Sequence, residues 1–254
     1  MNLYWLEQTE ADVPAGNAWL SAAEALHQDS LRFAKRRNDW RLGRWTAKLA
    51  LASQRSIPLD ARELAAIEIR PDPSGAPEAF VADQHAGVAI SLSHRAGRAI
   101  CAIASSEAAI GCDLEGIEPH SAGFFDDYFT PAEQAWIADA SEADHPWLMS
   151  MVWSAKESAL KALRVGLRVS TRSVVVSPID LPAKGGAFDP LLANHQPNRE
   201  HWLPLRVESE DSRLFQGWWK RTGQFVYTVV SHPPADAPIL LELAAHSYAP
   251  PTAT

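Results

Sequence analysis

The sequence predicts an α+β fold of two halves, each with one long helix and a small antiparallel sheet. In the first half, a helical pattern runs from about Leu31 to Ser53 and is followed by two apolar strands. In the second half, a helical pattern free of Gly and Pro covers about 147–164, with strand patterns on both sides of it. We place the boundary between 107 and 108, so the halves are residues 1–107 and 108–254.

Length and composition are those of an ordinary globular protein. The chain has 254 residues, enough for one large or two small domains, and 46% of them are hydrophobic. The two cysteines, Cys101 and Cys112, fall in predicted strands and give no disulfide framework or zinc spacing. Neither a signal peptide nor an apolar stretch long enough to cross a membrane is visible. We therefore expect a cytoplasmic protein without membrane association.

Charge is distributed unevenly along the chain. The formal net charge of −8 argues against nucleic acid as a general partner. Residues 32–48 nevertheless hold a cluster of basic side chains against the single acid Asp39, whereas residues 99–155 contain no Lys or Arg. The first segment is suited to phosphates and the second to a divalent cation.

The predicted helix from Leu31 opens at Asp29-Ser30, a plausible N-cap. Its basic side chains recur at helical spacing on one face: Arg37, Arg41, Arg44 and Lys48. Such a stripe is most often a solvated surface. It is also a candidate phosphate-binding ridge, because the guanidinium fork matches phosphate oxygens.

A strand and a helix carry the strongest candidate chemistry. In Gly111-Cys112-Asp113-Leu114-Glu115, alternation places both carboxylates on one face, and Gly111 leaves room there for something to approach. In the later helix, Trp153, Glu157 and Lys161 recur along one side. If the two elements pack together, three carboxylates and one ammonium converge. Oxygen ligands of this kind suit Mg²⁺ held together with substrate phosphates.

Each motif alone has a simpler interpretation. Acidic residues are common on an exposed strand face, and Glu157 before Lys161 is the favoured order of a surface salt bridge on a helix. Either motif by itself is more often structural than catalytic.

Other elements are predicted from local signals. Thr130, Pro131 and Glu133 form a capping box that starts a helix. The tail from 232 to 254 has five prolines and is expected to be peripheral. We expect a strand at each of these places, with an irregular surface segment at 178–198: Leu3–Leu6, Ile67–Arg70, Val88–Ser93, Arg98–Ala104, Ser173–Ser177, Leu205–Glu208, Arg213–Lys220 and Gln224–Ser231.

Together the strand and helix resemble the signature of the 4′-phosphopantetheinyl transferase superfamily, in its longer surfactin-synthetase-activating type. That signature is Gly-x-Asp-x-Glu followed some forty residues later by Trp-x-x-Lys-Glu-x-x-x-Lys, matched here at 111–115 and 153–161. With Leu42-Gly43-Arg44 and the strand end at Ser93-His94, the resemblance extends over roughly 36–231.

This resemblance implies two pseudo-symmetric halves in one monomeric chain, with the active site at the interface between them, although the two sequences do not repeat obviously. It implies Mg-dependent transfer of the 4′-phosphopantetheine arm from coenzyme A to a serine of an acyl or peptidyl carrier protein, releasing 3′,5′-ADP. Asp113, Glu115 and Glu157 would hold Mg²⁺, and Glu157 and Lys161 would be catalytic.

The resemblance also implies contacts to the phosphates of coenzyme A, the co-substrate. These would come from Arg37, Arg44, Ser93, His94 and Lys161. The family's usual Lys is replaced here by Ala76, and we hypothesise that Arg95 supplies the missing charge.

Two other functions stay open at this point. One is another metal-dependent phosphoryl-transfer enzyme, such as a nucleotide pyrophosphatase, using the same carboxylates. The other is a non-catalytic module that binds coenzyme A or a carrier protein.

Overall fold

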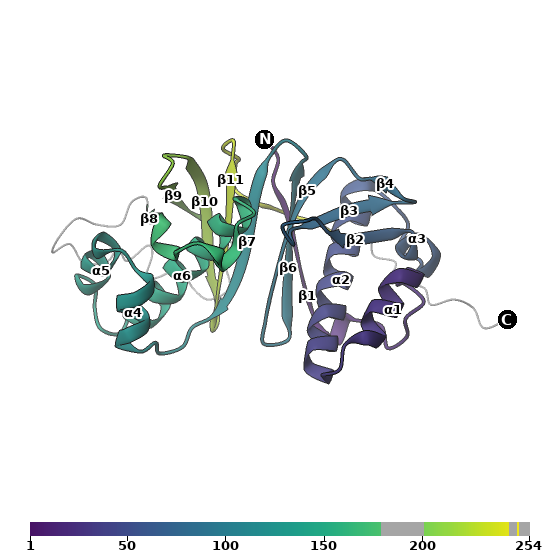
Figure 1. Cartoon of the computed structure of the whole chain (residues 1–254), viewed down its shortest axis with the longest axis horizontal. Helices are drawn as coiled ribbons and strands as arrows, with labels where there is room; N and C mark the ends of the chain where they lie inside the picture. Colours follow the sequence, from purple (N-terminus) through teal and green to yellow (C-terminus); the bar gives the residue numbers. More distant parts are fainter. Residues whose placement is uncertain (179–200, 244–247, 249–254) are drawn as a thin grey trace. The chain divides into compact units, whose positions relative to one another are not determined.

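The computed structural model describes residues 1–178, 201–243 and 248. The chain divides into two compact units, of which the first comprises residues 1–108 and 238–254 and the second residues 109–237. Both units combine helices with small, mainly antiparallel sheets (Figure 1). The predicted α+β class is therefore confirmed.

The first unit is built around helix α2, Ala34–Arg55. This helix packs on strands β1, β5 and β6 of a four-stranded sheet ordered β12-β1-β6-β5. A second sheet is ordered β2-β3-β4. The other elements of the unit are η1 (Glu10–Asp12), α1 (Ala22–Ser30), α3 (Ala61–Ala65), β1 (Tyr4–Thr9), β2 (Ile67–Pro71), β3 (Pro77–Val81), β4 (Gln84–His85), β5 (Val88–Arg95), β6 (Arg98–Ser105) and β12 (Ile239–Leu240).

Helix α2 begins later than the sequence predicts. Residues 22–30 form the separate helix α1, capped by Ser21 and Glu24, and Ser30 is its last residue. The N-cap of α2 is Phe33, not Asp29 or Ser30. Leu42, Trp45 and Leu49 recur at helical spacing along one side of this helix and are all buried.

The C-terminal tail differs from the expectation that it is a peripheral part of the second half. Strand β12 pairs in parallel with β1, matching Ile239 to Tyr4 and Leu240 to Trp5. The next residue, Leu241, is buried in the core of the first unit. Apolar residues after the prolines thus extend the first sheet, a long-range pairing that local patterns do not reveal.

The second unit is a five-stranded sheet ordered β7-β11-β10-β9-β8, covered by helix α6 (Figure 1). Its core joins the apolar side of α6 to the sheet. The elements are β7 (Ala109–Gly116), α4 (Ala122–Tyr128), α5 (Pro131–Ala138), α6 (His145–Ala162), η2 (Gly166–Arg168), η3 (Thr171–Ser173), β8 (Val174–Pro178), β9 (Leu203–Ser209), β10 (Leu214–Thr222) and β11 (Phe225–His232).

Most local predictions are confirmed to within a few residues. Helix α5 has the predicted capping box of Thr130 and Glu133, with Pro131 as its first residue. All eight predicted strands are present, displaced at their ends by no more than a few residues. Both cysteines are buried and reduced. The segment predicted to be irregular, 178–198, lies almost wholly outside the described residues.

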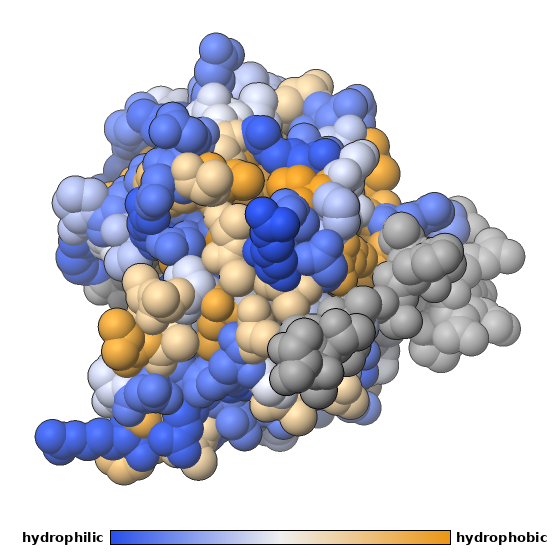
Figure 2. Space-filling model, turned by 90° about the vertical axis from the view of Figure 1, so that its right-hand side faces the viewer, coloured by the Kyte–Doolittle hydropathy of each residue, from blue (hydrophilic) through white to orange (hydrophobic). Residues whose placement is uncertain are grey.

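The face shown in Figure 2 is mainly hydrophilic, with small separate hydrophobic patches. Among the large hydrophobic side chains of the described residues, Leu26 and Phe33 are the most exposed, at 73% each. Within the described part of the chain, no helix is both long and apolar enough to cross a membrane.

The position of β12 predicts an asymmetric response to two neighbouring substitutions. Leu241→Ala should lower the free energy of unfolding by about 2 kcal/mol, because it removes a buried side chain from the core. Leu240→Ala, at a residue that is 40% exposed, should cost about 0.5 kcal/mol or less. Urea denaturation followed by tryptophan fluorescence measures both. Equal effects would contradict the assignment of this segment to the core.

Candidate functional site

Strand β7 presents Asp113 to helix α6. The strand pairs antiparallel with β11, with Asp113 opposite Thr228. Contact with α6 buries the face that carries Asp113, so this residue is only 3% exposed. The side of β7 that carries Gly111 and Asp113 is therefore covered by α6 and is not an exposed strand face.

The absence of a side chain at Gly111 allows this contact. A Cβ at this residue would lie 1.8 Å from the Ser158 carbonyl oxygen and 2.8 Å from the Ala162 backbone nitrogen. Helix α6 therefore packs backbone-to-backbone on β7. The space expected beside Asp113 for a ligand is instead occupied, next to Gly111, by the helix itself.

Close packing brings Lys161 onto Asp113. The Lys161 Nζ donates to Asp113 Oδ1 at 2.7 Å and to the Cys112 carbonyl oxygen at 3.0 Å. Burial favours the neutral amine, but the negative charge of Asp113 and its hydrogen bond outweigh burial, so the pKa of Lys161 is raised. The convergence of strand and helix predicted from the two motifs is present for this pair.

Glu157 lies one helical turn before Lys161 and is half-buried. Burial raises the pKa of Glu157, the charge of Asp113 raises it further, and Lys161 partly opposes both. Two carboxyl groups thus share one ammonium group. A carboxyl with a raised pKa is better suited to accept a proton than an ordinary glutamate.

Glu115 lies further along the same strand and is partly buried. No set of three or more His, Cys, Asp or Glu side chains in the described residues is arranged to hold a metal ion. The structure thus couples Asp113, Glu157 and Lys161 electrostatically, and the three predicted ligands Asp113, Glu115 and Glu157 do not form a ready-made metal-binding set.

A hydroxyl network that the sequence did not suggest also holds α6 on the sheet. Ser154 Oγ and Ser158 Oγ lie 2.9 and 2.8 Å from Thr228 Oγ1. All three side chains are fully buried. In the sequence, this network could have been inferred from the two serines at i and i+4 of a largely apolar helix, because that spacing places them on the same side of the helix.

Trp153 has a packing role. Its ring lies 5.0 Å from that of Phe124 and 5.1 Å from that of Tyr128, both in α4. These contacts attach α4 to the helix that carries Glu157.

In the first unit, the predicted basic stripe is not one exposed face. Lys48 is completely buried, and Arg41 hydrogen-bonds to residues of the 14–17 loop. Arg44 is 18% exposed, lies 3.8 Å from Glu24 and stacks over the Trp40 ring. The solvated-surface and phosphate-ridge interpretations are therefore both wrong for Lys48.

The remaining predicted phosphate contacts also lie in the first unit. Arg37 is partly buried and donates to the Leu31 carbonyl oxygen at 3.0 Å. Ser93 is half-buried and His94 is exposed near the end of β5. The following turn at Ala96 and Gly97 has positive φ angles, as a tight β-hairpin requires.

Residues 109–211 match the model of the 4′-phosphopantetheinyl transferase superfamily. The match lies within the second unit and includes Asp113, Glu157 and Lys161. No curated protein matches the chain. Among solved structures, the chain is similar to a Helicobacter pylori holo-acyl-carrier-protein synthase in complex with coenzyme A. That likeness has 18% identity and a TM-score of 0.32, and covers 41% of this chain and 99% of that one.

The contact at Gly111 predicts a large effect from the smallest side chain. Gly111→Ala should lower the free energy of unfolding by about 3 kcal/mol, because backbone must move to admit the Cβ. Gly123→Ala in α4 is the control, since a Cβ there meets only the Ser121 hydroxyl at 3.9 Å. Chemical denaturation measures both. A well-folded Gly111→Ala protein of unchanged stability would refute the close packing.

The raised pKa of Glu157 predicts a pH-dependent stability cost. The folded state keeps this proton to a higher pH than the unfolded state, so stability falls as pH rises from the ordinary glutamate pKa through the raised one. In metal-free buffer at neutral pH, Glu157→Gln should therefore raise Tm by a few degrees. The difference should vanish at a pH below the ordinary glutamate range. Calorimetry across pH tests this, and a lower neutral-pH Tm for the variant would contradict it.

Proposed function

We propose that the protein transfers the 4′-phosphopantetheine arm of coenzyme A to a serine hydroxyl of an acyl or peptidyl carrier protein and releases 3′,5′-ADP. One observation carries the proposal. The strand and helix that match the superfamily signature pack together, with Lys161 on Asp113 and Glu157 beside them. The superfamily model covers this same part of the chain. The longer, surfactin-synthetase-activating type is the form we propose, because the first unit supplies a basic helix.

Carboxylate oxygens are donors that suit a magnesium ion, although the described carboxylates form no ready-made set of three ligands. Mg²⁺ is commonly held by one or two carboxylates together with substrate phosphates. Burial raises the pKa of Glu157 most, and repulsion from Asp113 raises it further; a divalent cation bound by both carboxylates would relieve that repulsion. We propose these two as ligands, with Glu115 as a third. The ion would supply charge stabilisation for the pyrophosphate of coenzyme A.

The protein's own side chains have separate roles in the proposed reaction. The serine oxygen forms a new bond to the β-phosphorus of the coenzyme, and the bond to the bridging pyrophosphate oxygen breaks, so 3′,5′-ADP leaves. Glu157 accepts the serine proton. Lys161, held by Asp113 and the Cys112 carbonyl, offsets the charge that develops on the phosphate oxygens.

The first unit is proposed to bind the phosphates of coenzyme A. Arg44 is a candidate because its side chain remains partly exposed and Trp40 supports the guanidinium. Arg37, Ser93 and His94 are proposed to contribute further contacts. We propose that the enzyme acts as a monomer in the cytoplasm.

Intact-mass spectrometry of apo carrier proteins tests the proposal. Incubation with this protein, coenzyme A and Mg²⁺ should add the mass of one phosphopantetheine arm to at least one type of carrier. Glu157→Gln should slow the gain by about 100-fold or more, as expected for loss of a general base. Glu142→Gln, the same change at an exposed residue of the same unit, should leave it unchanged. Binding of coenzyme A without any mass gain would refute the proposal.

A further inference from the structure

Each unit buries an ion pair that the proposed reaction does not use. In the first unit, Lys48 of α2 lies 2.6 Å from Glu24 Oε2. The same ammonium donates to the carbonyl oxygens of Trp19 and Leu64 at 3.0 and 2.9 Å. The Glu24 carboxylate also accepts from the Ser21 backbone through Oε2 and from the Ile69 backbone through Oε1.

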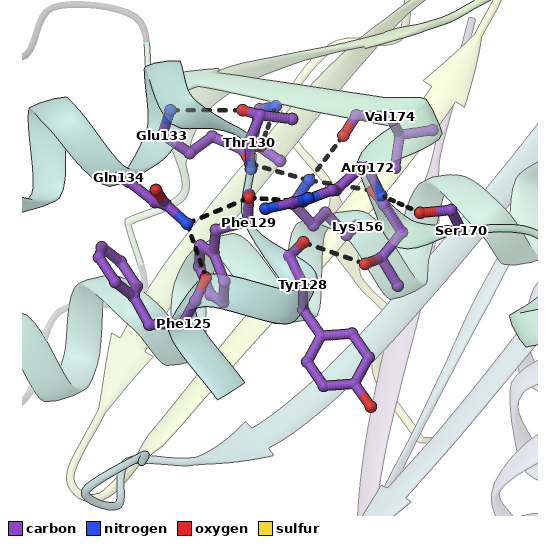
Figure 3. A network of polar contacts seen from close by, with 12 residues as sticks. Phe125, Tyr128, Phe129, Thr130, Glu133, Gln134, Lys156, Ser170, Arg172 and Val174 are labelled. Carbon is purple, nitrogen blue, oxygen red and sulfur yellow. Dashed lines mark hydrogen bonds and ion pairs between the residues drawn. The ribbon is translucent and has the colours of Figure 1, made fainter. Parts of the chain in front are cut away.

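In the second unit, Lys156 of α6 makes the corresponding set of contacts (Figure 3). Its ammonium lies 2.8 Å from Glu133 Oε2 and donates to the carbonyl oxygens of Thr171 and Val174 at 3.0 and 2.7 Å. Glu133 Oε2 accepts from the Thr130 backbone, and Oε1 accepts from Val176 at 2.7 Å. Lys156 and Glu133 are both fully buried.

The two sets agree atom for atom in most of their contacts. In both, the glutamate is the third helical residue of a capping box, and one oxygen receives the lysine and the cap backbone. The other oxygen receives a strand backbone nitrogen, 45 residues later in the first unit and 43 residues later in the second. The same buried Lys–Glu arrangement therefore occurs in both units, each time attaching the unit's long helix to neighbouring elements.

The Lys–Glu arrangement in the second unit fixes the helix that bears the proposed catalytic groups. Lys156 directly precedes Glu157, and its ammonium ties α6 to α5, η3 and β8 at once. A buried charge tolerates very few arrangements, because any rotation or slide of α6 would leave it unpaired. Burial lowers the pKa of Lys156, and the adjacent carboxylate opposes that shift.

We propose that Glu133 and Lys156 are a positioning pair that sets the register of α6 on the sheet, and so the placement of Glu157 and Lys161 against Asp113. The kinetic part rests on the proposed function. The competing explanation is that the pair contributes stability alone. The two explanations predict different results for a variant that lacks the pair but keeps the stability of the unsubstituted protein.

The test compares Lys156→Met with the double variant Glu133→Gln/Lys156→Met. The single change leaves a buried carboxylate unpaired and should lower Tm by about 10 °C. The double change removes both charges and should bring Tm back to within a few degrees of the unsubstituted protein. Glu133→Gln alone, which keeps an acceptor for Val176, is the reserve if the double variant does not fold.

Two readouts separate positioning from stability. In the double variant, kcat for phosphopantetheine transfer should fall by about 100-fold with little change in KM, as expected for misplaced groups. Hydrogen–deuterium exchange should be faster in α6 although Tm is retained, and this readout does not depend on the protein being a transferase. Unchanged kcat and unchanged exchange in the stable double variant would overturn the proposal. If the unsubstituted protein shows no transfer, the proposed function fails, and exchange alone decides the positioning claim.

The first unit provides a matched control. Glu24→Gln/Lys48→Met removes the same arrangement from α2, which carries none of the proposed proton-transfer groups. It should accelerate exchange in α2 and leave exchange in α6 as it was. Faster exchange in both helices would show a general loss of stability and would overturn the proposal.

Discussion

The contact between Gly111 of β7 and the backbone of α6 determines the arrangement of the whole candidate site. With a hydrogen in place of a side chain, the strand lies so close that any Cβ would meet the Ser158 carbonyl. At this separation the Lys161 ammonium reaches both the Asp113 carboxylate and the Cys112 carbonyl. Buried hydroxyl groups of Ser154 and Ser158 add contacts to β11.

The site that results is electrostatically costly. Asp113 and Glu157 are two carboxyl groups that interact electrostatically with each other and with a single ammonium group, and burial keeps Glu157 from full solvation. Clusters of this kind are expected where chemistry requires perturbed groups rather than where a fold needs stability. The surrounding contacts hold α6 in one position in spite of that cost: the ion pair of Glu133 and Lys156, and the aromatic contacts of Trp153 with α4.

Sequence patterns predicted the parts of this arrangement that depend on neighbours along the chain. Alternation in β7 predicted that Asp113 and Glu115 share one face of the strand, and spacing predicted that Glu157 and Lys161 share one side of the helix; that these two faces meet was only a condition of the prediction, and for Asp113 and Lys161 the structure meets it. The capping box of Thr130 and Glu133 was likewise visible. The break between α1 and α2 was missed because residues 31–33 contain neither Gly nor Pro.

Burial of Lys48 and Lys156 was not predicted, because lysine in a helical pattern is normally taken as a surface residue. Their partners come from segments far away in the chain, such as Leu64 for Lys48 and Val174 for Lys156. A usable signal exists in retrospect: each unit has a Ser/Thr-x-x-Glu box followed, at nearly the same spacing, by a lysine among apolar helical residues. Pairing of β12 with β1 depended on tertiary contact in the same way.

The most direct test of the central claim is to measure 3′,5′-ADP release and carrier mass gain in the same reaction, with and without apo carrier protein. The account predicts that the two products appear in equal amounts, and that release stops when carrier is omitted. Release that continues at the same rate without carrier would contradict it, and would identify the carboxylates of β7 and α6 as part of a hydrolytic site instead.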